Sequence, residues 1–152
     1  MAVATTIKPE TLKKLKDLIR VNLDNSKGLR AAAETVESQS IASTFREIAD
    51  ARDQHSFELQ KVLLLSGEDI PDTGSVLGAV RRWWMEVRGK LNGGDDHVVL
   101  IEAERAEDTI KARYEEVLAE VAGNPVNDIL LRIYSEVKRG HDRIRDLRDA
   151  TA

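Results

Sequence analysis

The sequence contains no cysteine, and only three of its 152 residues are proline. Without cysteine the chain cannot form a disulfide, a zinc site with thiolate ligands or a cysteine nucleophile. This composition fits the reducing environment of the cytoplasm. Aromatic residues make up only 4% of the chain, so long β-strands, which favour aromatic side chains, are not expected.

Two further absences concern membranes and nucleic acids. No apolar run approaches the roughly 18 residues that a membrane-spanning helix needs. Residues 1–10 lack the charged start and apolar core of a signal peptide. The formal net charge is −4, whereas a domain that binds nucleic acid usually carries a basic surface. We therefore expect a cytoplasmic protein with no nucleic-acid partner.

Charged residues are abundant, at 33% of the chain. The apolar residues between them recur every three or four positions, which is the spacing of one face of a helix. Pro9 suits the first turn of a helix. Ser38, Ser40 and the aspartates at 95 and 96 can cap later helices. Four long helices are predicted, over about 9–36, 40–66, 96–123 and 125–149, with the end of the last one frayed over 149–152.

The connections between these segments predict how they are arranged. Short turns join the first helix to the second and the third to the fourth, so each pair is an antiparallel hairpin. The long middle connection, 67–95, can run back along a bundle and carries a shorter helix over about 75–92. We expect one all-α domain over 1–152, a ferritin-like four-helix bundle of two hairpins with an extra crossover helix.

Several sequence segments also carry a resemblance to a known family. The segments are Asp24–Glu34, Glu58–Gln60, Glu102–Asp108 and His141–Asp149. No single segment is specific to the family, and the resemblance depends on their order and spacing along the chain. Together they resemble the bacterial proteins of "domain of unknown function 2383". The resemblance runs from about Leu12 to Ala150 and implies a ferritin-like four-helix bundle. It implies no activity, because the family has none established.

A few polar residues lie within or at the edge of the apolar stripes, each near the middle of its helix. These residues are Asn22, Ser26, Arg52, Glu107 and His141. A buried charge needs a partner, because an unpaired one costs several kcal/mol, on the order of 3–5. We therefore expect a buried polar network in which Arg52 pairs with Glu107.

A metal site is the alternative interpretation of these positions. Glu104, Glu107, His141 and His55 offer the carboxylate and imidazole ligands that suit iron, manganese or zinc. Di-metal bundles use Glu-x-x-His on one helix face, but the residues three before His55, His97 and His141 are Arg, Gly and Lys. Arg52 would also repel a metal ion beside Glu107.

The predicted crossover helix holds both tryptophans of the chain. Trp83 and Trp84 lie beside Arg81 and Arg82. The apolar side of this helix can cover the open side of the bundle. Trp and Arg are also typical anchors of oligomer or partner contacts, and a basic amphipathic helix with Trp can lie on a membrane surface.

The leading functional hypothesis is a non-enzymatic helical-bundle protein that acts through self-association or a protein partner, in stress or metal homeostasis. The alternative is a ferritin-like metal-binding protein that binds or oxidises iron through Glu104, Glu107, His141 and His55. No P-loop, dinucleotide fingerprint or nucleophile elbow points to another enzyme class.

Overall fold

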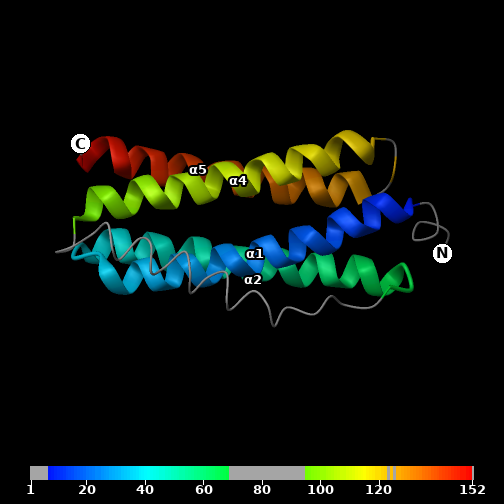
Figure 1. Cartoon of the computed structure of the whole chain (residues 1–152), viewed down its shortest axis with the longest axis horizontal. Helices are drawn as coiled ribbons and strands as arrows, with labels where there is room; N and C mark the ends of the chain where they lie inside the picture. Colours follow the sequence, from blue (N-terminus) through cyan, green and yellow to red (C-terminus); the bar gives the residue numbers. More distant parts are fainter. Residues whose placement is uncertain (1–6, 69–94, 123, 125, 152) are drawn as a thin grey trace.

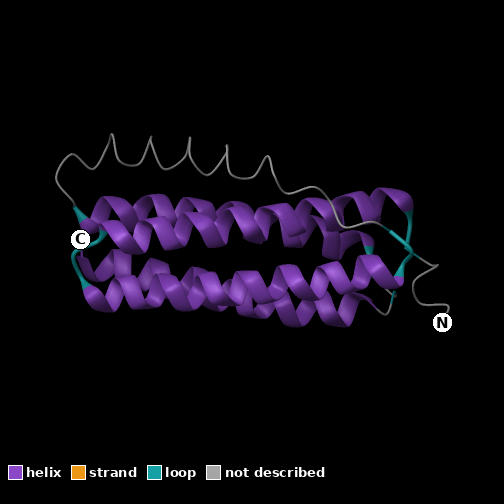
Figure 2. Ribbon diagram, turned by 90° about the horizontal axis from the view of Figure 1, so that it is seen from below, coloured by secondary structure: helices purple, strands orange, loops and turns teal. Residues whose placement is uncertain are grey.

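The computed structural model describes residues 7–68, 95–122, 124 and 126–151, and in this part of the chain it contains four α-helices and no β-strand. The helices lie side by side as an elongated bundle (Figures 1 and 2). They are α1 (Pro9–Thr35), α2 (Gln39–Leu65), α4 (Asp96–Glu120) and α5 (Val126–Thr151). The predicted all-α four-helix architecture is confirmed. None of these helices is both long enough and apolar enough to cross a membrane.

Local sequence signals explain where the helices begin and end. Pro9 occupies the first turn of α1, where its missing N–H is not needed. Ser38 caps α2 by accepting a hydrogen bond from the Ile41 amide, and Asp95 caps α4 in the same way through the His97 amide. Gly67, with φ 76°, adopts the left-handed conformation that often follows a helix.

The predicted fraying of the last helix is wrong, because α5 stays helical through Thr151. The Thr151 hydroxyl lies 2.9 Å from Nδ1 of His97, and it also bonds to the Arg148 carbonyl. These contacts attach the end of α5 to the start of α4.

The directions of the helices follow from the side chains that pair between them. Lys14 pairs with Glu120 and Asp17 pairs with Arg113, so α1 and α4 are antiparallel. Each hairpin is also antiparallel, so α2 and α4 run in the same direction (Figure 1). The end of α2 and the start of α4 therefore lie at opposite ends of the bundle.

The core of the bundle consists of two apolar clusters. One surrounds Leu15, Leu59 and Ile133, and the other surrounds Phe45, Leu100 and Ile144. The helices bring a set of buried polar residues between the two clusters: Asn22, Asn25, Ser26, Arg52, His55, Ser56 and Glu107. We call this set the polar layer.

The predicted crossover helix lies outside the described residues. So do Arg81, Arg82, Trp83 and Trp84, and their proposed contacts stay predictions.

Candidate functional site

Arg52 is the centre of the polar layer and one of the largest fully buried side chains of the described residues. Its Nη2 donates a hydrogen bond to Oε1 of Glu107, across the bundle from α2 to α4. Its Nε donates to Oδ1 of Asn25 on α1, at 3.0 Å. A buried cation is thus neutralised by one carboxylate and held by one amide.

The fourth helix contributes to this layer through a glycine. A Cβ atom built on Gly140 of α5 would lie 2.9 Å from Nη2 of Arg52, which is closer than real Cβ contacts. It would also lie 3.4 Å from Cγ2 of Ile48. Gly140 therefore leaves the space that the guanidinium fills, and all four helices meet at this level.

A second pair in the layer is Asn22 with Tyr114. The Asn22 amide nitrogen donates to the Tyr114 hydroxyl at 2.7 Å and to the Leu18 carbonyl at 2.8 Å. Burial raises the pKa of Tyr114 well above its usual value, so the hydroxyl stays protonated. This pair connects α1 to α4 beside the Arg52 network.

His55 lies on α2 one turn after Arg52, and it is fully buried. Its Nε2 is 3.0 Å from Oε1 of Glu136 on α5, and its Nδ1 is buried without a hydrogen-bond partner among the described residues. Burial lowers the pKa of His55 below its usual 6.5, and the positive charge of Arg52 adds to this effect. The hydrogen bond to Glu136 acts in the opposite direction but does not reverse the shift.

This shift predicts a loss of stability in mild acid. The unfolded chain protonates His55 near pH 6.5, whereas the folded protein binds that proton only at lower pH. The free energy of unfolding should therefore fall as the pH drops below 6.5. The His55→Gln variant can still donate to Glu136 but has no titrating ring. Urea unfolding of the wild type and of His55→Gln from neutral to mildly acidic pH measures how much of the pH-dependent loss is due to His55. An equal loss of unfolding free energy in the two proteins would mean that His55 does not cause it.

The other residues predicted for the network or the metal site do not lie together, and two of them form separate ion pairs or hydrogen bonds. His141 lies at the rim of the bundle, with Nε2 2.6 Å from Asp108 and Nδ1 3.2 Å from Asp142, and so outside the polar layer. Glu104 pairs with Arg148. Ser26 is buried in the layer, as its position in the apolar stripe indicates.

A metal ion does not fit this arrangement of the predicted ligands. Glu104, Glu107, His141 and His55 each have a different partner, and the partner of Glu107 is a cation. No group of three or more His, Asp or Glu side chains among the described residues could hold a metal ion. Metal binding stays a prediction that this geometry does not favour.

The sequence-based prediction lacks Asn25 and Ser56, which belong to the polar layer, and Gly140, which contacts it. Asn25 lies within the apolar arc of its helix, so helical periodicity could have identified it. Gly140 stands in the interior of a helix, where glycine is unfavourable by about 1 kcal/mol compared with Ala. That cost indicates a packing role, although it does not indicate which side chain needs the space.

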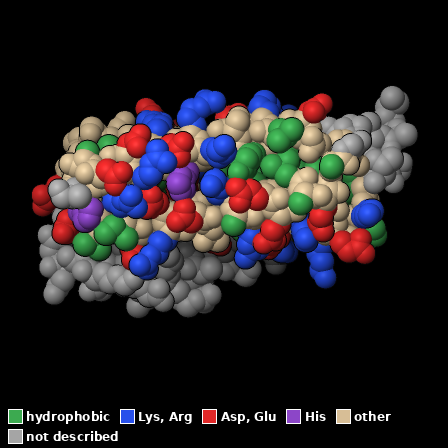
Figure 3. Space-filling view, turned by 90° about the horizontal axis from the view of Figure 1, so that it is seen from above, with side chains coloured by type: hydrophobic (Ala, Val, Ile, Leu, Met, Phe, Trp, Pro, Cys, Tyr) green, Lys and Arg blue, Asp and Glu red, His purple; other side chains and the backbone are tan. Residues whose placement is uncertain are grey.

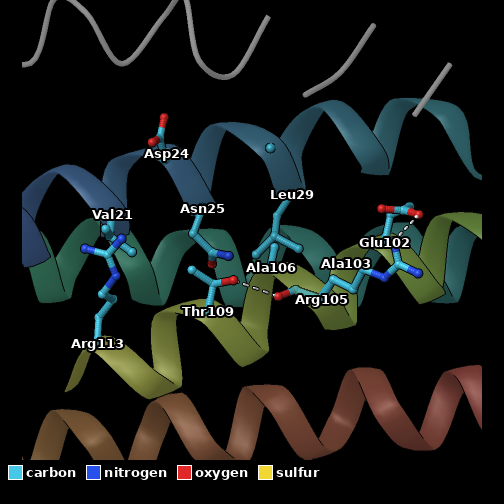
Figure 4. A pocket seen from close by; sticks show the side chains of 11 residues that line it. Val21, Asp24, Asn25, Leu29, Glu102, Ala103, Arg105, Ala106, Thr109 and Arg113 are labelled. Carbon is cyan, nitrogen blue, oxygen red and sulfur yellow. Dashed lines mark hydrogen bonds and ion pairs between the residues drawn. The ribbon is translucent and has the colours of Figure 1, made fainter. Parts of the chain in front are cut away.

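A pocket of about 430 Å³ opens between α1 and α4, next to the polar layer. Apolar and small side chains form much of its wall, among them Val21, Leu29 and Ala106. Asn25 extends from α1 toward α4 in this pocket, whereas Asp24 points away from α4 (Figure 4). The pocket is thus in contact with the network around Arg52 through Asn25.

Comparison with known proteins places the sequence in a family. Residues 10–120 match the family model described as Domain of unknown function (DUF2383). The chain belongs to this family. The DUF2383 match includes α1, α2 and α4, with Asn25, Arg52 and Glu107, and it ends before α5 and Gly140. A search of curated proteins found no match.

Proposed function

We propose that this DUF2383 protein is a non-enzymatic, ferritin-like bundle of the cytoplasm that acts through self-association. A contact with a different protein is the alternative. The common direction of α2 and α4 supports the ferritin-like arrangement, in which a long crossover joins two antiparallel hairpins. Fold alone does not indicate function, so the proposal depends on a surface of the bundle.

The supporting observation is a group of exposed apolar side chains near one end of the bundle. Phe57, Leu64 and Leu65 of α2 and Leu131 of α5 are between 48% and 78% exposed. The ion pair of Glu58 with Arg132 places Phe57 and Leu131 at similar levels along the bundle.

Other apolar side chains lie toward the same end. Figure 3 shows the side of the bundle formed by α4 and α5, and apolar side chains gather there over the half in which α5 begins. Exposed apolar patches of this kind often mark contacts between proteins. A symmetric dimer would bury the same patch of two copies against each other.

Two substitutions test self-association. The molar mass of the wild-type chain in light scattering should be a multiple of 17.0 kDa. Phe57→Glu and Leu131→Glu should each reduce it toward the monomer, because a charge would be buried in the contact. Ser43→Glu adds the same charge at an exposed position in the other half of α2 and should leave the mass unchanged. A monomeric wild type, or an unchanged mass in both variants, would contradict the proposal.

A further inference from the structure

Arg52 fixes the orientation of the Asn25 amide. A guanidinium has only donors, so the group that faces Nε of Arg52 must be the amide oxygen. The amide nitrogen of Asn25 must then point away from Arg52. The nitrogen can therefore face the pocket, on a residue that is only 7% exposed. Asn25 lines the pocket between α1 and α4, and its side chain points from α1 toward α4 (Figure 4).

The rest of the pocket combines an apolar wall with two cations of α4 and with the carboxylates of Asp24 and Glu102. Val21, Leu29 and Ala106 offer an apolar surface. Arg113 and Arg105 also line the pocket, paired with Asp17 and Glu102. Each guanidinium has five N–H donors, so a single carboxylate partner leaves donors available.

We propose that this pocket binds a small amphipathic carboxylate, with its acidic group on the Asn25 amide nitrogen and Arg113 and its apolar part along Val21, Leu29 and Ala106. A volume of about 430 Å³ falls within the range of pockets that hold small molecules. Such pockets are mostly apolar and contain a few fixed polar groups that orient the ligand. Here the fixed donor is Asn25, because Arg52 donates to its amide oxygen from within the core and Glu107 in turn holds Arg52. The polar layer would thus orient a ligand-binding group in addition to joining the helices.

Octanoate is a suitable probe, and octanol is its neutral control. Calorimetric titration should show saturable binding of octanoate to the full chain. Asn25→Asp keeps the oxygen that accepts from Arg52 but replaces the donor with a second, negatively charged oxygen. This variant should bind octanoate at least about tenfold more weakly, which corresponds to about 1.4 kcal/mol. Its affinity for octanol should change much less, because the apolar wall is intact.

A second variant separates the role of the pocket from any effect on folding. Arg113 is about half-exposed, so Arg113→Gln should fold normally and still bind octanoate more weakly than the wild type does. In an NMR titration of the wild type, octanoate should shift the side-chain amide signal of Asn25. The proposal is overturned if the wild type shows no saturable octanoate binding. It is also overturned if both variants bind octanoate as tightly as the wild type, since the binding would then be apolar only.

Discussion

Arg52→Met should lower the free energy of unfolding by about 3–5 kcal/mol. Arg52 donates to Glu107 and Asn25, and all three side chains are buried. Met fills a similar volume but provides no charge, so the Glu107 carboxylate would remain in the core without a cation. One of its oxygens, Oε2, is already buried, and no described residue forms a hydrogen bond with it. Urea unfolding followed by circular dichroism measures the loss.

Two further variants show whether the loss comes from an unpaired buried charge. Arg30 pairs with Asp50 and Asp53 at the surface, and Arg30→Met should cost less than about 1 kcal/mol, as exposed ion pairs do. The double variant Arg52→Met with Glu107→Leu removes both charges. It should recover most of the lost stability, because buried pairs replaced by apolar residues are often neutral or stabilising. A loss below about 1 kcal/mol in Arg52→Met alone would mean that the pair is not buried together.

The sequence was sufficient to predict the four helices, because their ends are determined locally. Ser38, Asp95 and Pro9 act within one turn of the residues that they cap or start. Burial of Asn22, Ser26, Arg52 and Glu107 also followed from periodicity, since one helical wheel decides which face each residue occupies.

Contacts between helices were harder to predict, because they depend on how one helix is shifted along another. His141 was expected to join the buried network, but its ring instead lies within hydrogen-bond distance of Asp108 and Asp142 at the rim. Its neighbour Gly140, about 100° away around α5, faces Arg52 instead. The pocket beside Asn25 depends on the separation of α1 from α4, and no pattern within one helix specifies that distance.

Gly140→Ala should destabilise the fold by about 1–3 kcal/mol, as other overpacked core substitutions do. This is the reverse of the usual effect, because Ala stabilises a helix interior by about 1 kcal/mol compared with Gly. The added Cβ would lie 2.9 Å from Nη2 of Arg52. Arg52 cannot move aside easily, because Asn25 and Glu107 hold its guanidinium on two sides. Urea unfolding of the variant measures the change.

The Arg52→Met background shows whether the guanidinium causes this effect. Met has a flexible, uncharged end that can move away from a methyl group. In this background Gly140→Ala should therefore cost much less, or should stabilise the protein through its helix propensity. The difference between the two backgrounds is the coupling energy of a double-mutant cycle and should exceed about 1 kcal/mol. An equal effect in both backgrounds would mean that Ile48 or the α5 backbone, rather than Arg52, requires glycine at this position.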